Sequence, residues 1–148
     1  MARGAYAAKL PPAQRLRYEV APMPELNAVV VHREEVHPRL IIVRVAPEGW
    51  QLPDFSPGQY VALGILGSAP RIAGSDPEDD RPKPDKLILR AYSIASSSKA
   101  KEYLEFFVNL VDDGTFTPRL FALKEGDRLW MKQKVKGLFT LDEVPEGI

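Results

Sequence analysis

The sequence predicts an all-β fold, an antiparallel barrel or sandwich that contains one short helix. Six short segments are rich in Val, Ile, Leu, Tyr and Phe, and each is bounded by Pro, Gly, Asp or Glu, which is typical of strands separated by turns. These segments do not alternate with long helical patterns, so we do not expect a parallel α/β sheet. The chain has 148 residues, a length that fits one domain with its own core.

The individual elements follow from these patterns in chain order. The predicted strands span residues 27–34, 39–46, 58–66, 86–95, 103–111 and 127–135. Residues 67–86 are rich in Pro, Gly and Asp and predict a long loop that could be mobile. Thr117 followed by Pro118 predicts the start of a short helix, with the Thr117 hydroxyl as N-cap and proline at the first helical position.

Composition and charge narrow the classes of function. The 20 basic and 20 acidic side chains cancel, which argues against a general nucleic-acid binder. The chain has no cysteine, which excludes disulfides, iron–sulfur ligation by these residues and thiol catalysis, and fits a reducing cytoplasm. No apolar run approaches the roughly 20 residues that cross a bilayer. We therefore expect a cytoplasmic protein without a membrane segment, and a flexible N-terminal extension at residues 1–26.

Residues 90–93 combine groups that a buried strand does not need. Arg90 supplies a planar cation suited to phosphate, and Tyr92 lies on the same strand face about 6.6 Å further along. Ser93 follows and could donate a hydrogen bond to a ring nitrogen. Residues 114–117 form a turn where free backbone N–H groups could bind an anion, although an ordinary capped connector helix explains the same pattern. Together these groups would suit one extended ligand with a flat ring and a diphosphate.

Four motifs resemble the ferredoxin–NADP reductase superfamily in their order and spacing. RAYSIASS (90–97) is similar to the R-x-Y-S flavin motif, and FSPGQYVAL (55–63) is similar to the turn and strand that precede it. DGTFTPRLFALKEGDRLWM (113–131) and GLFTLDEVP (137–145) resemble segments of the bacterial ferredoxin–NADP reductases. The resemblance covers most of the chain. It implies a six-stranded antiparallel Greek-key barrel with one short helix, and FAD as the cofactor.

The resemblance also implies roles for particular residues. Arg90 would contact the FAD pyrophosphate, Tyr92 would lie against the isoalloxazine and ribityl chain, and Ser93 would approach flavin N5, so Tyr92 and Ser93 are the catalytic candidates. Thr140 would lie near the approach of the nicotinamide. The other expected cofactor contacts are Ala91 within the motif, Ile94, Ala95 and Ser96 towards the adenosine half, and Gly114, Thr115, Phe116 and Thr117 around the pyrophosphate.

By the same resemblance, the chain would be the FAD-binding half of an enzyme that passes electrons between NADPH and ferredoxin or flavodoxin. The barrel would occupy residues 27–148, and the family's NADP-binding domain would lie outside this chain, which contains no G-x-G-x-x-G loop. The isolated chain is then expected to be inactive or weak. Two alternatives stay open: the FAD domain of an oxygenase reductase or flavin reductase, and a barrel that has lost flavin and serves as an interaction module.

Two further patterns have simpler explanations. Lys132, Lys134 and Lys136 would face one way on an extended strand and could attract an acidic electron carrier, but a solvated strand face explains them better. His32 and His37 have no third ligand nearby, so we expect surface histidines and no metal site.

Overall fold

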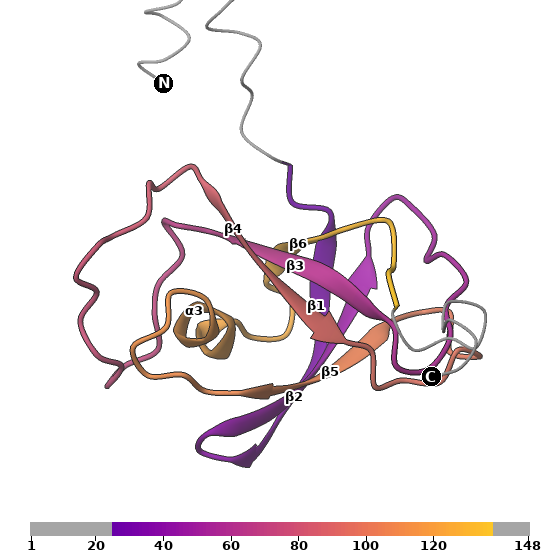
Figure 1. Cartoon of the computed structure of the whole chain (residues 1–148), viewed down its shortest axis with the longest axis horizontal. Helices are drawn as coiled ribbons and strands as arrows, with labels where there is room; N and C mark the ends of the chain where they lie inside the picture. Colours follow the sequence, from indigo (N-terminus) through magenta and orange to yellow (C-terminus); the bar gives the residue numbers. More distant parts are fainter. Residues whose placement is uncertain (1–24, 138–148) are drawn as a thin grey trace, which may run out of the picture.

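The computed structural model describes residues 25–137, which form six strands and one short helix (Figure 1). The elements are β1 (Ala28–His37), β2 (Leu40–Pro47), β3 (Tyr60–Leu66), β4 (Leu87–Ser93), β5 (Leu104–Asn109), α3 (Thr117–Ala122) and β6 (Arg128–Met131). Each of the six predicted strands is present. The predicted loop at residues 67–86 is the connection between β3 and β4, and we call it the β3–β4 loop.

The six strands belong to one antiparallel sheet with the order β4-β3-β6-β1-β2-β5. Because β6 returns to lie beside β1, the order is that of a Greek key. The two edge strands converge at one end, where the Ala95 N–H donates to the Glu105 carbonyl at 2.8 Å. The helix α3 lies in the opening between β4 and β5 (Figure 1). The predicted fold, an antiparallel Greek-key barrel with one short helix, is therefore confirmed.

The core forms because alternate residues of each strand face the barrel interior. In β2, for example, Ile41, Val43 and Val45 are fully buried, whereas the residues between them are partly exposed. The helix closes the barrel from one side, since its buried side chains Leu120 and Phe121 join the same hydrophobic cluster. The barrel is thus a packed core, and functional side chains must lie at its open edge.

Two sequence expectations are wrong in detail. The last strand ends at Met131 and does not continue to residue 135, so the lysines at 132, 134 and 136 do not lie on one regular strand face. The N-cap of α3 is Phe116, and the Thr117 side chain makes no capping hydrogen bond. Its hydroxyl instead accepts from the Val111 N–H at 2.8 Å and donates to the Val111 carbonyl at 3.2 Å, which closes the turn before the helix.

Within residues 25–137, no helix has the length and apolar character needed to cross a membrane.

Candidate functional site

The edge strand β4 presents Arg90 and Tyr92 on the inner side of the barrel. Arg90 pairs with Leu63 and Tyr92 pairs with Val61, and both partners on β3 are buried in the core. Because directly paired residues of an antiparallel sheet point to the same face, Arg90 and Tyr92 share that face. Arg90 is nevertheless exposed, since β4 has no neighbouring strand on its other side. The shared face that the sequence predicted therefore lies at the opening of the barrel.

The guanidinium of Arg90 is available to a ligand. Its Nη1 donates to the neighbouring Leu89 carbonyl at 2.7 Å, and Arg90 forms no ion pair with any residue that the structure describes. It lines a cleft of about 840 Å³ together with Thr115 from the turn before α3. Two segments that the sequence analysis assigned to one ligand thus meet in one cleft. The remaining wall of this cleft comes from the β3–β4 loop and carries Asp80, Arg81, Lys83 and Lys86.

Tyr92 lies deeper than Arg90 and packs against two core aromatics. Its ring centroid is 5.9 Å from that of Phe116 and 6.3 Å from that of Phe106, the latter pair in an edge-on arrangement. Burial raises the pKa of Tyr92 to about 12, and the positive charge of Arg90 offsets this rise only in part. The phenol therefore stays protonated at all physiological pH values. It can donate a hydrogen bond or support a flat ring, but it cannot act as a base.

We expect Tyr92→Phe to change how stability depends on alkaline pH. In the folded chain the phenol ionises near 12, whereas in the unfolded chain it ionises near its ordinary value of 10.0. Between these values the folded state binds more protons, so the free energy of unfolding falls as pH rises from about 10 to 12. The Phe variant should lose less stability over this range in urea unfolding at pH 9 and pH 11. An equal loss in parent and variant would show that Tyr92 does not cause it.

The residues after Tyr92 alternate between exposed positions and positions that are buried or bonded to neighbouring strands. Ser93 is exposed at the end of β4, opposite Tyr60. Ile94 is buried in the core, and its N–H donates to the Gln59 carbonyl at 2.8 Å. The Ser96 hydroxyl accepts from the Glu105 N–H at 3.0 Å, which ties this segment to β5. The predicted ligand contacts of Ala91, Ile94, Ala95 and Ser96 stay predictions, as does that of Thr140, which lies outside the described residues.

The turn at residues 111–117 offers backbone donors to the cleft. The Gly114 N–H is already used, since it donates to the Val111 carbonyl at 2.9 Å. The N–H groups of Thr115, Phe116 and Thr117 have no acceptor among residues 25–137. Backbone N–H groups that converge in a turn form a concavity that suits an anion. The glycine-bearing turn therefore retains three of the donors that the sequence analysis assigned to a phosphate.

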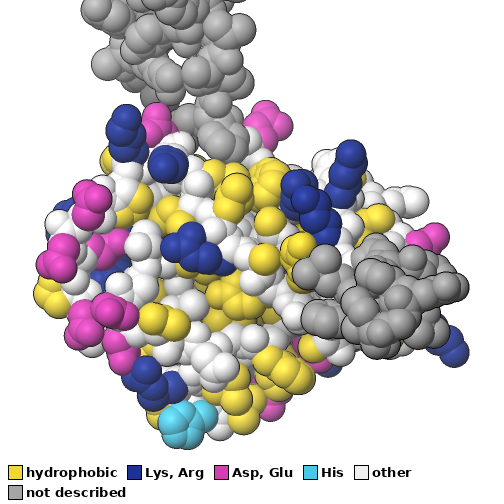
Figure 2. All heavy atoms as spheres, viewed as in Figure 1, with side chains coloured by type: hydrophobic (Ala, Val, Ile, Leu, Met, Phe, Trp, Pro, Cys, Tyr) yellow, Lys and Arg dark blue, Asp and Glu magenta, His cyan; other side chains and the backbone are white. Residues whose placement is uncertain are grey.

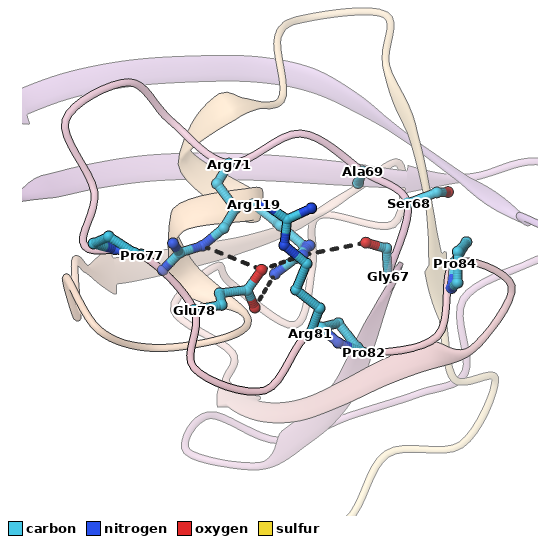
Figure 3. Close-up of a pocket in the computed structure, with 10 residues that line it drawn as sticks. All are labelled: Gly67, Ser68, Ala69, Arg71, Pro77, Glu78, Arg81, Pro82, Pro84 and Arg119. Carbon is cyan, nitrogen blue, oxygen red and sulfur yellow. Dashed lines mark hydrogen bonds and ion pairs between the residues drawn. The ribbon is translucent and has the colours of Figure 1, made fainter.

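A buried cluster of charged side chains holds this turn in place, and the sequence analysis missed it (Figure 3). Arg119 of α3 donates from Nη1 and Nη2 to the two carboxylate oxygens of Glu78, at 2.9 and 2.8 Å. The same guanidinium donates to the carbonyls of Thr115 at 2.7 Å and of Gly67 at 3.2 Å. The signal was available, because an arginine inside an otherwise apolar short helix needs a buried partner.

Arg71 completes this charged cluster. Its Nη2 donates to the carbonyls of Gly114 at 2.9 Å and Asp112 at 3.2 Å, and its Nε lies 3.9 Å from Glu78 Oε1. Arg119 holds the pKa of Glu78 below its ordinary value, chiefly through their hydrogen bonds, and Arg71 contributes in the same direction. We call Arg71, Glu78 and Arg119 the charged clamp. It fixes the carbonyl groups of Asp112, Gly114 and Thr115, which accept hydrogen bonds from Arg71 of the β3–β4 loop and Arg119 of α3.

No group of His, Asp or Glu side chains within residues 25–137 has a geometry that could hold a metal ion. His32 lies 3.8 Å from Glu34 and 3.8 Å from Glu125, both on the surface.

The chain is similar in sequence to flavin-binding oxidoreductases. Residues 80–138 match the family described as oxidoreductase FAD-binding domain. A ferredoxin–NADP reductase of Pseudomonas aeruginosa is 39% identical over 93 residues, which are 63% of this chain and 30% of that protein. The residues of this chain that match the family include β4, the 111–117 turn, α3 and β6.

Solved structures share the same fold. The ferredoxin NADP⁺ reductase of Neisseria gonorrhoeae with bound FAD and NADP superposes with a TM-score of 0.61 at 21% identity, over 82% of this chain and 42% of that one. The ferredoxin reductase in carbazole 1,9a-dioxygenase superposes with a TM-score of 0.53 at 27% identity, over 79% of this chain and 30% of that one. The chain spans about 30% of the length of the curated relatives that it matches.

Proposed function

We propose that this chain is the flavin-binding part of an oxidoreductase that passes electrons between NADPH and a ferredoxin or flavodoxin. The proposal is supported by the match of residues 80–138 to an oxidoreductase FAD-binding domain and by the similarity to ferredoxin–NADP reductases. The observation that carries the proposal is the meeting of Arg90 and Thr115 in one cleft, at the open edge of a barrel with the matching fold. A fold alone would not support a function. Arg90, a cation without an ion-pair partner among the described residues, lies near the free backbone N–H groups of residues 115–117, and such groups together can bind a phosphate.

The residues of the cleft fit a flavin dinucleotide. The planar Arg90 fork suits the oxygens of a diphosphate, and the N–H groups of residues 115–117 supply further donors of the kind that phosphates accept. We propose that these groups hold the FAD diphosphate from two sides. A carbonyl oxygen in the turn would repel a phosphate. The carbonyl oxygens of Gly114 and Thr115 instead accept hydrogen bonds from the arginines of the charged clamp.

Tyr92 and Ser93 are the proposed contacts of the flavin ring. The aromatic ring of Tyr92 packs against that of Phe116, and its phenol remains protonated. Ser93 is exposed one residue further along β4, where its hydroxyl could donate a hydrogen bond to the ring. When bound, FAD supplies the exchange of electrons between a hydride donor and a one-electron carrier. The contribution of these two residues is to orient the ring and to hold a proton near it.

The partners belong to the same proposal. Because the chain spans about 30% of its curated relatives, we propose that residues 27–148 supply the flavin site and that NADPH binds through a second domain. Lys132, Lys134 and Lys136 stay candidates for contact with an acidic carrier, although they lie beyond the end of β6. A reductase of an oxygenase is the second candidate function, and the 27% identity to the carbazole dioxygenase reductase favours it. Electron transfer to ferredoxin and to an oxygenase partner, measured on the complete enzyme, would separate the two.

Titration of the cofactor-free chain with FAD and with FMN tests the proposal. We expect FAD to bind more tightly than FMN, because Arg90 and the 115–117 donors form a cradle for two phosphates. Binding is measured by the change in flavin fluorescence. Equal affinities for FAD and FMN would contradict the diphosphate assignment. If neither flavin binds, the chain would instead be a barrel that has lost its cofactor, the remaining alternative.

A further inference from the structure

The cleft beyond Arg90 is lined by positive side chains from the β3–β4 loop. Arg81, Lys83 and Lys86 contribute three cations, Arg90 a fourth, and Asp80 the one carboxylate of the lining, so the local formal charge is +4 − 1 = +3. None of these four cations forms an ion pair within residues 25–137. Since the whole chain has a formal charge of zero, this concentration is a local property of the cleft. It favours an anionic or strongly hydrogen-bonding ligand beyond the phosphate site itself.

The segment that carries these lysines is held rigidly. The N–H groups of Gly67 and Ser68 donate to the carbonyls of Lys86 at 2.9 Å and Pro84 at 3.0 Å, which extends the pairing of β3 with β4. The Lys86 N–H donates to the Lys83 carbonyl at 3.1 Å, which closes a turn. A Cβ on Gly67 would lie 2.2 Å from the Lys83 carbonyl oxygen, so only glycine permits this approach. The lysines therefore project from a fixed backbone, and a ligand would not have to order the loop.

The charged clamp fixes the same loop from its other end. Glu78 lies between Arg119 and Arg71, and Arg81 lies beside them in the neighbouring pocket that Figure 3 shows. Arg81 also lines the cleft of Arg90. The loop is also tied to α3 through the Ile72 N–H, which donates to the Pro118 carbonyl at 2.9 Å. The predicted long loop is thus a wall of the cofactor cleft, attached to both β3 and α3. Figure 2 shows hydrophobic side chains at the centre of this face of the molecule, with Lys and Arg side chains around them.

The order of residues along β4 gives the direction of the ligand. A strand rises about 3.3 Å per residue, so Arg90 lies roughly 10 Å from Ser93 and Lys86 roughly 13 Å beyond Arg90. With the flavin ring at Ser93 and the diphosphate at Arg90, the cleft continues towards Lys86. In the opposite direction, Ile94 is buried in the core and the Ser96 hydroxyl is bonded to Glu105. On this placement the adenosine monophosphate half of FAD extends along the β3–β4 loop, and not towards Ile94, Ala95 and Ser96 as the resemblance implied.

We infer that Lys83 and Lys86 bind the adenosine monophosphate half of FAD and thereby increase the preference of this cleft for FAD over FMN beyond that given by Arg90 and the 115–117 donors. The inference rests on the proposed function, since it assumes that FAD occupies the cleft. The ammonium groups are donors for the phosphate, the ribose hydroxyls and the adenine ring nitrogens, all of which accept hydrogen bonds. FMN lacks this half of the molecule, so it would not contact either lysine.

The test compares the double variant Lys83→Gln/Lys86→Gln with the parent in fluorescence titrations with FAD and with FMN. Contacts of exposed charges are modest, so we expect about a three- to fivefold loss of FAD affinity for each lysine and roughly tenfold for both at low salt. The affinity for FMN should stay unchanged. The difference for FAD should shrink at high salt, because exposed charges are screened. The control is Lys99→Gln/Lys124→Gln, which removes the same charge from exposed positions outside the cleft.

Each outcome has a definite meaning. A selective loss of FAD affinity in the Lys83/Lys86 variant, with the control like the parent, supports the inference. An unchanged affinity for FAD, or an equal loss for FAD and FMN, overturns it and leaves the proposed function in place. Failure of the parent chain to bind FAD overturns the proposed function together with the inference. All four lysines are exposed and form no ion pair with the part of the chain that the structure describes, so the variants are expected to fold.

Discussion

Glu78→Gln is expected to lower the free energy of unfolding by about 3 kcal/mol, the lower end of the cost of removing one partner from a buried ion pair. The side chains of Arg119 and Glu78 are 5% and 7% exposed, and two hydrogen bonds of 2.8 and 2.9 Å join them. Neutralising the carboxylate leaves Arg119 buried without its counter-ion, with Arg71 nearby. The amide oxygen of Gln can still accept one hydrogen bond, which keeps the loss moderate. Urea unfolding of parent and variant at pH 7 measures the difference.

The control for Glu78 is an ion pair of similar length on the surface. Lys101 and Asp54 are joined at 2.9 Å, but both side chains are exposed, so Asp54→Asn should leave the stability nearly unchanged. The double variant Glu78→Leu/Arg119→Met should recover part of the lost stability, because Arg119 is then no longer left buried without its counter-ion, whereas Arg71 still loses its contact with Glu78. An effect of Glu78→Gln as small as that of Asp54→Asn would show that the charged clamp does not hold the loop.

Lowering the pH should also reduce the free energy of unfolding of the parent protein, by part of the amount that Glu78→Gln removes. The folded-state pKa of Glu78 is lowered by Arg119, so the pair stabilises the fold above the ordinary pKa of a glutamate. That contribution is lost as pH falls through the lowered pKa of the folded state. Glu78→Gln should therefore show a weaker decline of stability below about pH 4 than the parent.

Local sequence patterns were sufficient to predict the barrel. Hydrophobic alternation and turn residues located every strand, because strand burial is a property of neighbouring residues along the chain. The end of β6 was misplaced, because the alternation of Lys132 to Lys136 continues the pattern of a strand. In the structure this segment pairs with β3 only through the Lys132 N–H, which donates to the Ala62 carbonyl, and through an isolated bridge between Lys136 and Tyr60. The N-cap of α3 was misassigned for a related reason: the Thr117 hydroxyl has a better acceptor and donor in Val111, six residues away.

The candidate site was predictable only where its residues form a contiguous motif. Arg90, Tyr92 and the 114–117 turn each carry a local signal, and the cleft joins Arg90 to Thr115. The charged clamp carries no such signal, because Glu78 and Arg119 are 41 residues apart and meet only through the fold. Composition predicted a loop at residues 67–86 correctly, but it could not indicate that buried ion pairs attach this loop to the helix. Only the structure shows that the β3–β4 loop lines the cleft.

Arg90→Ala is expected to weaken FAD binding by about 1.5–3 kcal/mol, the range for a hydrogen bond to a charged group, which corresponds to roughly 10- to 150-fold. Arg90→Lys should recover part of this loss, because an ammonium keeps the charge but cannot form the two-pronged contact of a guanidinium. The fold should not change, since Arg90 is exposed and, among residues 25–137, its side chain bonds only to the adjacent Leu89 carbonyl. Arg128→Ala removes the same charge at an exposed position outside the cleft and should bind FAD like the parent.

The measurement is a fluorescence titration of each cofactor-free variant, with urea unfolding to confirm equal stability. If Arg90→Ala and Arg90→Lys both bind FAD as tightly as the parent, the diphosphate does not lie at Arg90.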